Sequence, residues 1–216
     1  MTRSLFYPCC GTTDLARAMD GFAHLVDTVH GADPMLGIDR GLRSSWHLEP
    51  QRETPHRFVP ELSPRGAVGV RSISHYTTIA DHGTRHEYLA TRIRSNATPI
   101  PFTWHQYDAV EALNHIKGIA VFFFRRDRPE EGEGSSGIRW LDDVLLGRVL
   151  DKLEPNGLIV TDGAGMAGDS TQAALWNAPR LVDPVGNEFV AFERSFKCES
   201  VFCTLRRPTL VWRVRR

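Results

Sequence analysis

Hydrophobic and polar positions follow two different periods along the chain, and together they predict a mixed α/β protein. The stretch LFYPCCGTTDLARAMDGFAHLVDTV, which begins at Leu5, contains an apolar run, a tight turn, a helical segment and a second apolar run. We predict a strand over residues 5–9, a helix over 13–22 and a second strand over 23–29. A strand, a helix and a strand joined by short connections make one βαβ unit.

The pattern is interrupted between residues 30 and 97. Residues 30–66 are rich in Pro, Gly, Arg and His and show no sustained period, which predicts a long irregular excursion. Residues 67–79 and 87–94 then alternate on either side of a turn-prone segment, which predicts a β-hairpin. We interpret residues 30–97 as an insertion into the α/β domain.

The α/β pattern returns at residue 100. The run GIAVFFF at 118–124 is the most apolar of the chain and predicts a central strand buried on both faces. A helix over 139–153 is followed by EPNG, which is typical of a helix stop and a turn. The other predicted elements are strands over 100–107 and 158–161, a helix over 108–116, and a closing antiparallel hairpin made of 196–205 and 209–214.

Composition narrows the class of protein. A chain of 216 residues suits one domain with a sizeable core, so we predict a single domain over 1–216. The 26 basic and 26 acidic residues balance, which argues against a general binder of nucleic acid or anionic membranes. No long uncharged apolar segment or secretory signal is found, so we expect a cytoplasmic protein with reduced cysteines. The oligomeric state is unknown at this stage.

The order of elements resembles the class I S-adenosylmethionine-dependent methyltransferases, in which a mostly parallel sheet ends in an antiparallel hairpin. The segment WLDDVLLGRVLDKLEPNGLIVTDG carries the strongest resemblance, because LEPNGL stands where that superfamily turns into its fifth strand. The resemblance covers about 1–29 and 98–216. It implies a Rossmann-like methyltransferase sheet flanked by helices, S-adenosylmethionine as cofactor and an unknown methyl acceptor, expected to be a small molecule.

The resemblance also implies a cofactor site. The turn after the first strand would wrap the methionine part of the cofactor, an acid at the end of the second strand would bond the ribose, and an acid after the third strand would meet the adenine. A tight structural turn is the alternative, because only one glycine stands where the family has several. The implied cofactor-binding residues are Tyr7, Pro8, Cys9, Gly11, Asp14, Asp27 for the ribose and Asp108 for the adenine.

Catalytic candidates lie in the charged loop after the fourth strand. Methyl transfer often needs a base, and Asp127, Glu130 or Glu131 would supply it. Arg125 or Arg126 would hold an acidic group of the substrate, and we favour Asp127, Glu131 and Arg126. The family's amine-binding Asn/Asp-Pro-Pro-aromatic run is missing from this loop. A solvated charged loop is the alternative reading.

The sequence is also compatible with two other functions, and it argues against a metal site. The chain could be a non-catalytic descendant of the methyltransferase fold that acts as a binding or scaffolding protein. It could also be a nucleotide-binding or NAD-type Rossmann protein, against which the terminal hairpin argues. His82 and His86 are four residues apart, but Gly83 and the turn setting argue against a helical metal pair, so no metal site is expected.

Overall fold

The structure is a computed structural model that describes residues 2–8, 14–33, 37–38, 40–57, 82–124, 143–161 and 210–213. The chain divides into two compact units, Met1–Ile116 and Lys117–Arg216, and each is described by itself. Strands, both parallel and antiparallel, and a few helices make up the described residues, so the general α/β class is confirmed. The single-domain organisation stays a prediction.

Three neighbouring strands of the first unit are parallel. They are β1 (Ser4–Pro8), β2 (Thr28–Ala32) and β5 (Ile100–Gln106), and β2 pairs with both of the others. Helix α1 (Asp14–Phe22) connects β1 to β2, as the βαβ prediction requires. The predictions of the first strand, of α1 and of β5 are confirmed.

The second predicted strand is displaced along the chain. Residues Ala23–Leu25 form the 3-10 helix η1, and β2 begins only at Thr28. The prediction of a strand over 23–29 is therefore wrong. The physical reason is that α1 continues into a 3-10 turn, and Asp27 then accepts a hydrogen bond from the backbone N–H of Arg3 at 2.8 Å before the sheet begins.

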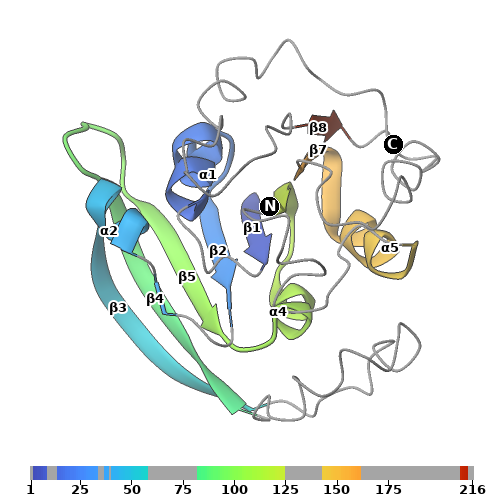
Figure 1. The fold of residues 1–216 in the computed structure, drawn as a ribbon, viewed down its shortest axis with the longest axis horizontal. Coiled ribbons are helices and arrows are strands. Elements are labelled where there is room, and N and C mark those ends of the chain that lie inside the picture. The colour runs from blue at the N-terminus through green and yellow to red at the C-terminus, as the bar shows by residue number, and fades with distance from the viewer. Residues whose placement is uncertain are drawn as a thin grey trace, which may run out of the picture. The chain divides into compact units, whose positions relative to one another are not determined.

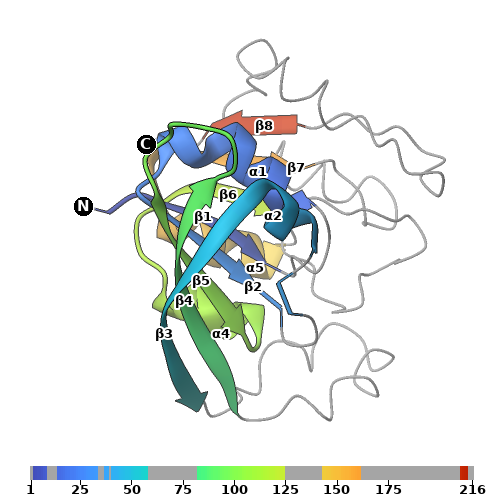
Figure 2. The same ribbon diagram turned by 90° about the vertical axis from the view of Figure 1, so that its left-hand side faces the viewer.

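Much of the described part of the predicted irregular excursion belongs to a long antiparallel ribbon, so the prediction is wrong over β3 (Trp46–Arg57). After α2 (Arg40–Ser45), β3 pairs with β4 (His82–Arg92), which pairs in turn with β5. Figures 1 and 2 show these strands side by side, and the strand order of the unit is β3-β4-β5-β2-β1. Two prolines in β3 suggested a loop, but prolines are tolerated at the edge of a sheet and at bulges, and the register shifts at Pro50.

The predicted hairpin of 67–79 and 87–94 is wrong in its pairing, because β4 pairs with β3 on one side and with β5 on the other. Its second arm corresponds to β4, whereas its first arm, 67–79, lies outside the described residues. The strand that pairs with β4 on the far side from β5 is β3.

One edge of the first unit collects the ends of several strands. Strands β1, β2 and β5 are parallel, and β3 runs in the same direction because it is separated from β5 by the antiparallel β4. Their last residues therefore lie at one edge, which we call the carboxyl edge. Helix α4 (Ala109–His115) begins there, directly after β5 (Figure 1). Its predicted position is confirmed.

Apolar side chains fill the interior of the first unit. Every residue of β1 is buried, and so are the two large aromatic residues in the middle of β5. Removing this much apolar surface from water stabilises the fold by about 2 kcal/mol for each fully buried large side chain. The largest of these side chains are Phe6, Tyr7, Phe22, Phe102 and Trp104.

The second unit contains β6 (Ile119–Phe124), α5 (Asp143–Lys152), β7 (Leu153–Thr161) and β8 (Leu210–Arg213). All six residues of β6 are buried, as the apolar run predicted. The EPNG segment lies inside β7, with Asn156 at φ 62°, so the predicted turn is an irregularity within a strand. Strand β8 confirms the predicted last strand and is antiparallel to β7. Its predicted hairpin partner, 196–205, lies outside the described residues, so the hairpin stays a prediction.

Among the residues that the structure describes, no helix combines the length and the apolar character needed to cross a membrane.

Candidate functional site

Titratable side chains gather at the carboxyl edge of the first unit. His105 is the next-to-last residue of β5, Tyr107 follows that strand, and Asp33 follows β2. All three are buried. The N–H of Asp33 donates to the carbonyl oxygen of His105 at 3.0 Å, which fixes the ends of the two strands together. Ligands of parallel α/β sheets bind at this kind of edge.

A chain of hydrogen bonds connects β2 to the start of α4. Nδ1 of His30 lies 3.1 Å from Nε2 of His105, and Nδ1 of His105 lies 2.6 Å from the hydroxyl oxygen of Tyr107. A neutral imidazole has one donor and one acceptor nitrogen, so one proton in each bond satisfies the whole chain. The half-buried His30 and the buried His105 and Tyr107 therefore form a network that we call the histidine relay.

Burial keeps the relay uncharged at neutral pH. It lowers the pKa of His30 to about 4, with a smaller effect from the charge of Arg85. Burial also lowers the pKa of His105 well below its ordinary 6.5, followed by the charges of His30 and Arg85. The same cause raises the pKa of Tyr107 to about 12. Neutral groups of this kind can pass a proton between them without leaving a charge in the interior.

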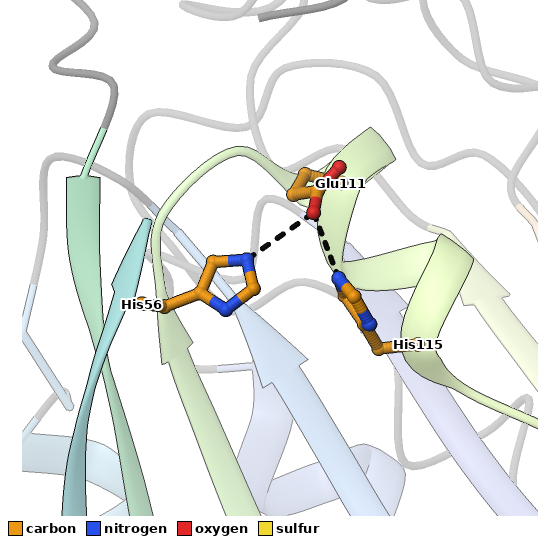
Figure 3. A group of neighbouring side chains, drawn as sticks. All are labelled: His56, Glu111 and His115. Carbon is orange, nitrogen blue, oxygen red and sulfur yellow. Dashed lines mark hydrogen bonds and ion pairs between the residues drawn. The ribbon is translucent and has the colours of Figure 1, made fainter. Parts of the chain in front are cut away.

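Three further side chains meet next to the relay. Nε2 of His56 lies 3.2 Å from Oε1 of Glu111, and Nε2 of His115 lies 2.7 Å from the same oxygen. Figure 3 shows the two imidazoles, one from β3 and one from α4, pointing at the carboxylate from different sides. The three ligand atoms all lie within 4.8 Å of one another, so this group could hold a metal ion.

The carboxylate of this group is held in its ionised form. Burial raises the pKa of Glu111, but hydrogen bonds from His115, His56 and Asn114 outweigh it and lower the pKa below its ordinary value. The His56 ring also stacks on Tyr107, with centroids 4.3 Å apart and an interplanar angle of 17°. This contact joins the three side chains to the histidine relay.

A cavity of about 520 Å³ lies at the opposite end of the first unit. Asp20 accepts a hydrogen bond from the Trp46 indole at 3.2 Å and forms an ion pair with Arg92 at 3.2 Å. The cavity is also lined by Asp27, which precedes β2, and by Ile100, which begins β5. It is therefore at the amino ends of the parallel strands, away from the edge where nucleotide sites form.

Several residues of the predicted cofactor turn belong to regular structure. Tyr7 and Pro8 pair with Gly31 and Ala32 inside the sheet, and Tyr7 is buried. Asp14 is the first residue of α1. The remaining predicted members of the turn, Cys9 and Gly11, lie outside the described residues.

Of the two predicted cofactor acids, Asp108 follows its strand as expected and Asp27 does not. Asp27 precedes β2 instead of following it, so its predicted place at the end of the second strand is wrong. Asp108 does follow β5, and its Oδ1 accepts hydrogen bonds from the backbone N–H groups of Val110 at 2.8 Å and Glu111 at 3.2 Å. Its carboxylate is the N-cap of α4.

The predicted catalytic residues Asp127, Glu131 and Arg126 lie outside the described residues. From the sequence we weighed His82 and His86 as a pair and did not consider Glu111 together with His115. Their i,i+4 spacing within a correctly predicted helix was the signal that could have found them.

Comparison with known proteins changes the functional interpretation of the chain. No protein-family model matches the chain. The chain is 27% identical over 128 residues to the NADH-cytochrome b5 reductase 2 of Gallus gallus. That match covers 54% of this chain and 41% of the reductase, so the chain spans less than half of the protein it resembles.

This similarity is to a reductase and overturns the methyltransferase reading. The resemblance to class I methyltransferases, the expected S-adenosylmethionine cofactor and both functions built on them, catalytic and non-catalytic, are therefore wrong. The order of elements misled because a βαβ start is common to many nucleotide-binding sheets.

Proposed function

We propose that the chain is an oxidoreductase-type protein that binds a reduced nicotinamide dinucleotide such as NADH. The observation that carries the proposal is the sequence similarity to NADH-cytochrome b5 reductase 2. The parallel arrangement of β1, β2 and β5 supports it, because dinucleotides bind beyond the carboxyl ends of such strands.

The position of Asp33 at the end of β2 also supports the proposal. Asp33 directly follows β2, and it comes about 20 residues after Gly11, as the ribose-binding acid does in dinucleotide-binding units. The bond from its N–H to the His105 carbonyl oxygen fixes its backbone. Asp33 would bond the ribose hydroxyls, and its charge would repel the additional phosphate of NADPH.

The histidine relay would supply protons at the same edge. A bound nicotinamide dinucleotide supplies a hydride, and the protein contributes orientation and proton-carrying groups. His105 and Tyr107 share a proton in a 2.6 Å hydrogen bond beside Asp33. His30, which lies on β2, continues this hydrogen-bonded chain from His105. We expect the electron acceptor, the substrate that is reduced, to be a small molecule.

Calorimetric titration tests this proposal directly. We expect NADH to bind with a Kd of roughly 1 μM to 1 mM, the range in which enzymes hold their substrates. S-adenosylmethionine is the control ligand because it carries adenosine but lacks the diphosphate and the nicotinamide. If neither NADH nor NAD⁺ gives heat at millimolar concentration, the proposal is overturned.

A further inference from the structure

The group of His56, Glu111 and His115 has the composition of a metal site. Two imidazole nitrogens and one carboxylate oxygen are a ligand set that zinc uses, with a fourth position left for water or substrate. Both Nε2 atoms already lie next to a single oxygen, at 3.2 Å and 2.7 Å. A cation that replaced the shared protons would meet all three ligands with small side-chain movements.

The ligands come from two elements that are fixed independently. Glu111 and His115 lie one turn apart on α4, whose first turn is capped by the Asp108 carboxylate. His56 is near the end of β3, where its backbone pairs with Gly83, and its ring is fixed by the stack on Tyr107. The positions of the ligands therefore do not depend on a metal being present.

A neighbouring side chain orients the carboxylate. Nδ2 of Asn114 donates to the other oxygen of Glu111, Oε2, at 3.3 Å, which leaves Oε1 facing the two imidazoles. Hydrogen bonds of this kind set the direction of metal ligands and are part of most metal sites.

Among the described residues of the site, His115 is the most exposed. The side chains of His56 and Glu111 are 21% and 20% exposed, whereas that of His115 is 46% exposed. An ion can enter past His115, and a water molecule can complete its coordination from solvent. The partly buried carboxylate supplies a negative charge where screening by water is reduced.

We propose that His56, Glu111 and His115 bind one divalent transition-metal ion, with zinc favoured by the ligand set. This site is separate from the proposed ribose contact of Asp33, and neither proposal depends on the other. The competing explanation is a hydrogen-bonded group that holds protons and no metal.

Cobalt titration distinguishes the two explanations. The tag-free full chain, stripped of metal with a chelator, is titrated with Co²⁺ and the visible absorption bands of the bound ion are recorded. We expect one Co²⁺ per chain and its displacement by Zn²⁺. Glu111→Gln and His115→Gln should each weaken binding by about 100-fold, and Asn114→Ala by about 10-fold, because loss of a ligand costs more than loss of its orienting partner.

A second His–Glu pair on the same sheet provides the matched control. Nδ1 of His86 lies 3.3 Å from a carboxylate oxygen of Glu53, but this pair does not belong to the three-ligand group. His86→Gln should therefore leave cobalt binding unchanged. The proposal is overturned if no stoichiometric cobalt bands appear, or if Glu111→Gln and His115→Gln bind cobalt as the unaltered chain does. His115 lies at the exposed end of α4, so we expect His115→Gln to fold even if Glu111→Gln does not.

Discussion

Nδ1 of His30 and Nε2 of His105 lie 3.1 Å apart and connect β2 to β5 through their side chains. Their rings are also stacked, with centroids 5.4 Å apart. A hydrogen bond between two imidazoles requires at least one unprotonated nitrogen, so the contact exists only while the pair is not fully charged. The connection between these strands therefore depends on pH.

We expect the free energy of unfolding to fall as the pH is lowered from about 6.5 toward about 4. The folded pKa values of both histidines lie below those of the unfolded chain, so the unfolded state binds more protons in this window. The stability that these histidines contribute is fully present above pH 6.5. Below that pH it falls by about 1.4 kcal/mol per pH unit for each histidine. Urea denaturation at a series of pH values measures the slope.

The exposed His24 provides the control for this slope. His24→Gln should show the same pH profile as the unaltered chain, whereas His30→Gln should reduce the slope to the part that His105 contributes. A profile that is already flat between pH 4 and 6.5 in the unaltered chain would contradict the buried, neutral histidine pair.

Removal of the Tyr107 hydroxyl should destabilise the first unit. Tyr107→Phe keeps the ring that stacks on His56 but removes the 2.6 Å bond to His105 Nδ1, which is then left buried without this partner. Such a loss costs about 1–3 kcal/mol. Chemical denaturation of this variant is compared with Tyr88→Phe on β4, a half-buried position where a change within about 0.5 kcal/mol is expected. Equal stability of the two variants would argue against the relay.

Gly83 is required where β4 meets the end of β5. A Cβ at this position would lie 2.5 Å from the carbonyl oxygen of Gln106 and 2.5 Å from Cβ of Tyr107. Gly83→Ala should therefore destabilise the chain by more than about 1 kcal/mol, because backbone must move. It should also weaken metal binding, since His56 pairs with Gly83.

Gly147 offers the opposite case. It lies within α5, and a Cβ there would meet nothing within 4 Å. Gly147→Ala should stabilise the chain by roughly 0.5–1 kcal/mol through the higher helix propensity of alanine. Thermal melting of both variants checks the pair, and a neutral or stabilising Gly83→Ala would show that the strands are not packed as closely as described.

Local sequence was sufficient to predict the elements whose own hydrophobic pattern shows which side chains are buried. The IAVFFF run of β6 and the amphipathic α4 were predictable because their own side chains determine their burial. Strand β2 was not, since TVHGA looks polar and turn-like until His30 meets His105, a residue far along the chain. Strand β3 was hidden by Pro50 and Pro55, which an edge strand with a bulge accommodates.

The candidate site was harder to predict for the same reason. Its members come from distant segments, and only the pairing of β3, β4 and β5 brings His56 to Glu111. The acid expected to bind the ribose was assigned to Asp27 because the strand was placed too early. Asp33 holds that position in the structure.

NADH binding by two aspartate variants shows whether the nucleotide binds at the carboxyl edge, and energy transfer from tryptophan to bound NADH provides the signal. We expect Asp33→Asn to weaken NADH binding by at least about tenfold, or about 1.4 kcal/mol, and to reduce the preference over NADPH. Asp27→Asn, at the amino end of the same strand, should bind NADH as the unaltered chain does. If Asp27→Asn loses NADH binding while Asp33→Asn retains it, the nucleotide does not bind at the carboxyl edge and the account is contradicted.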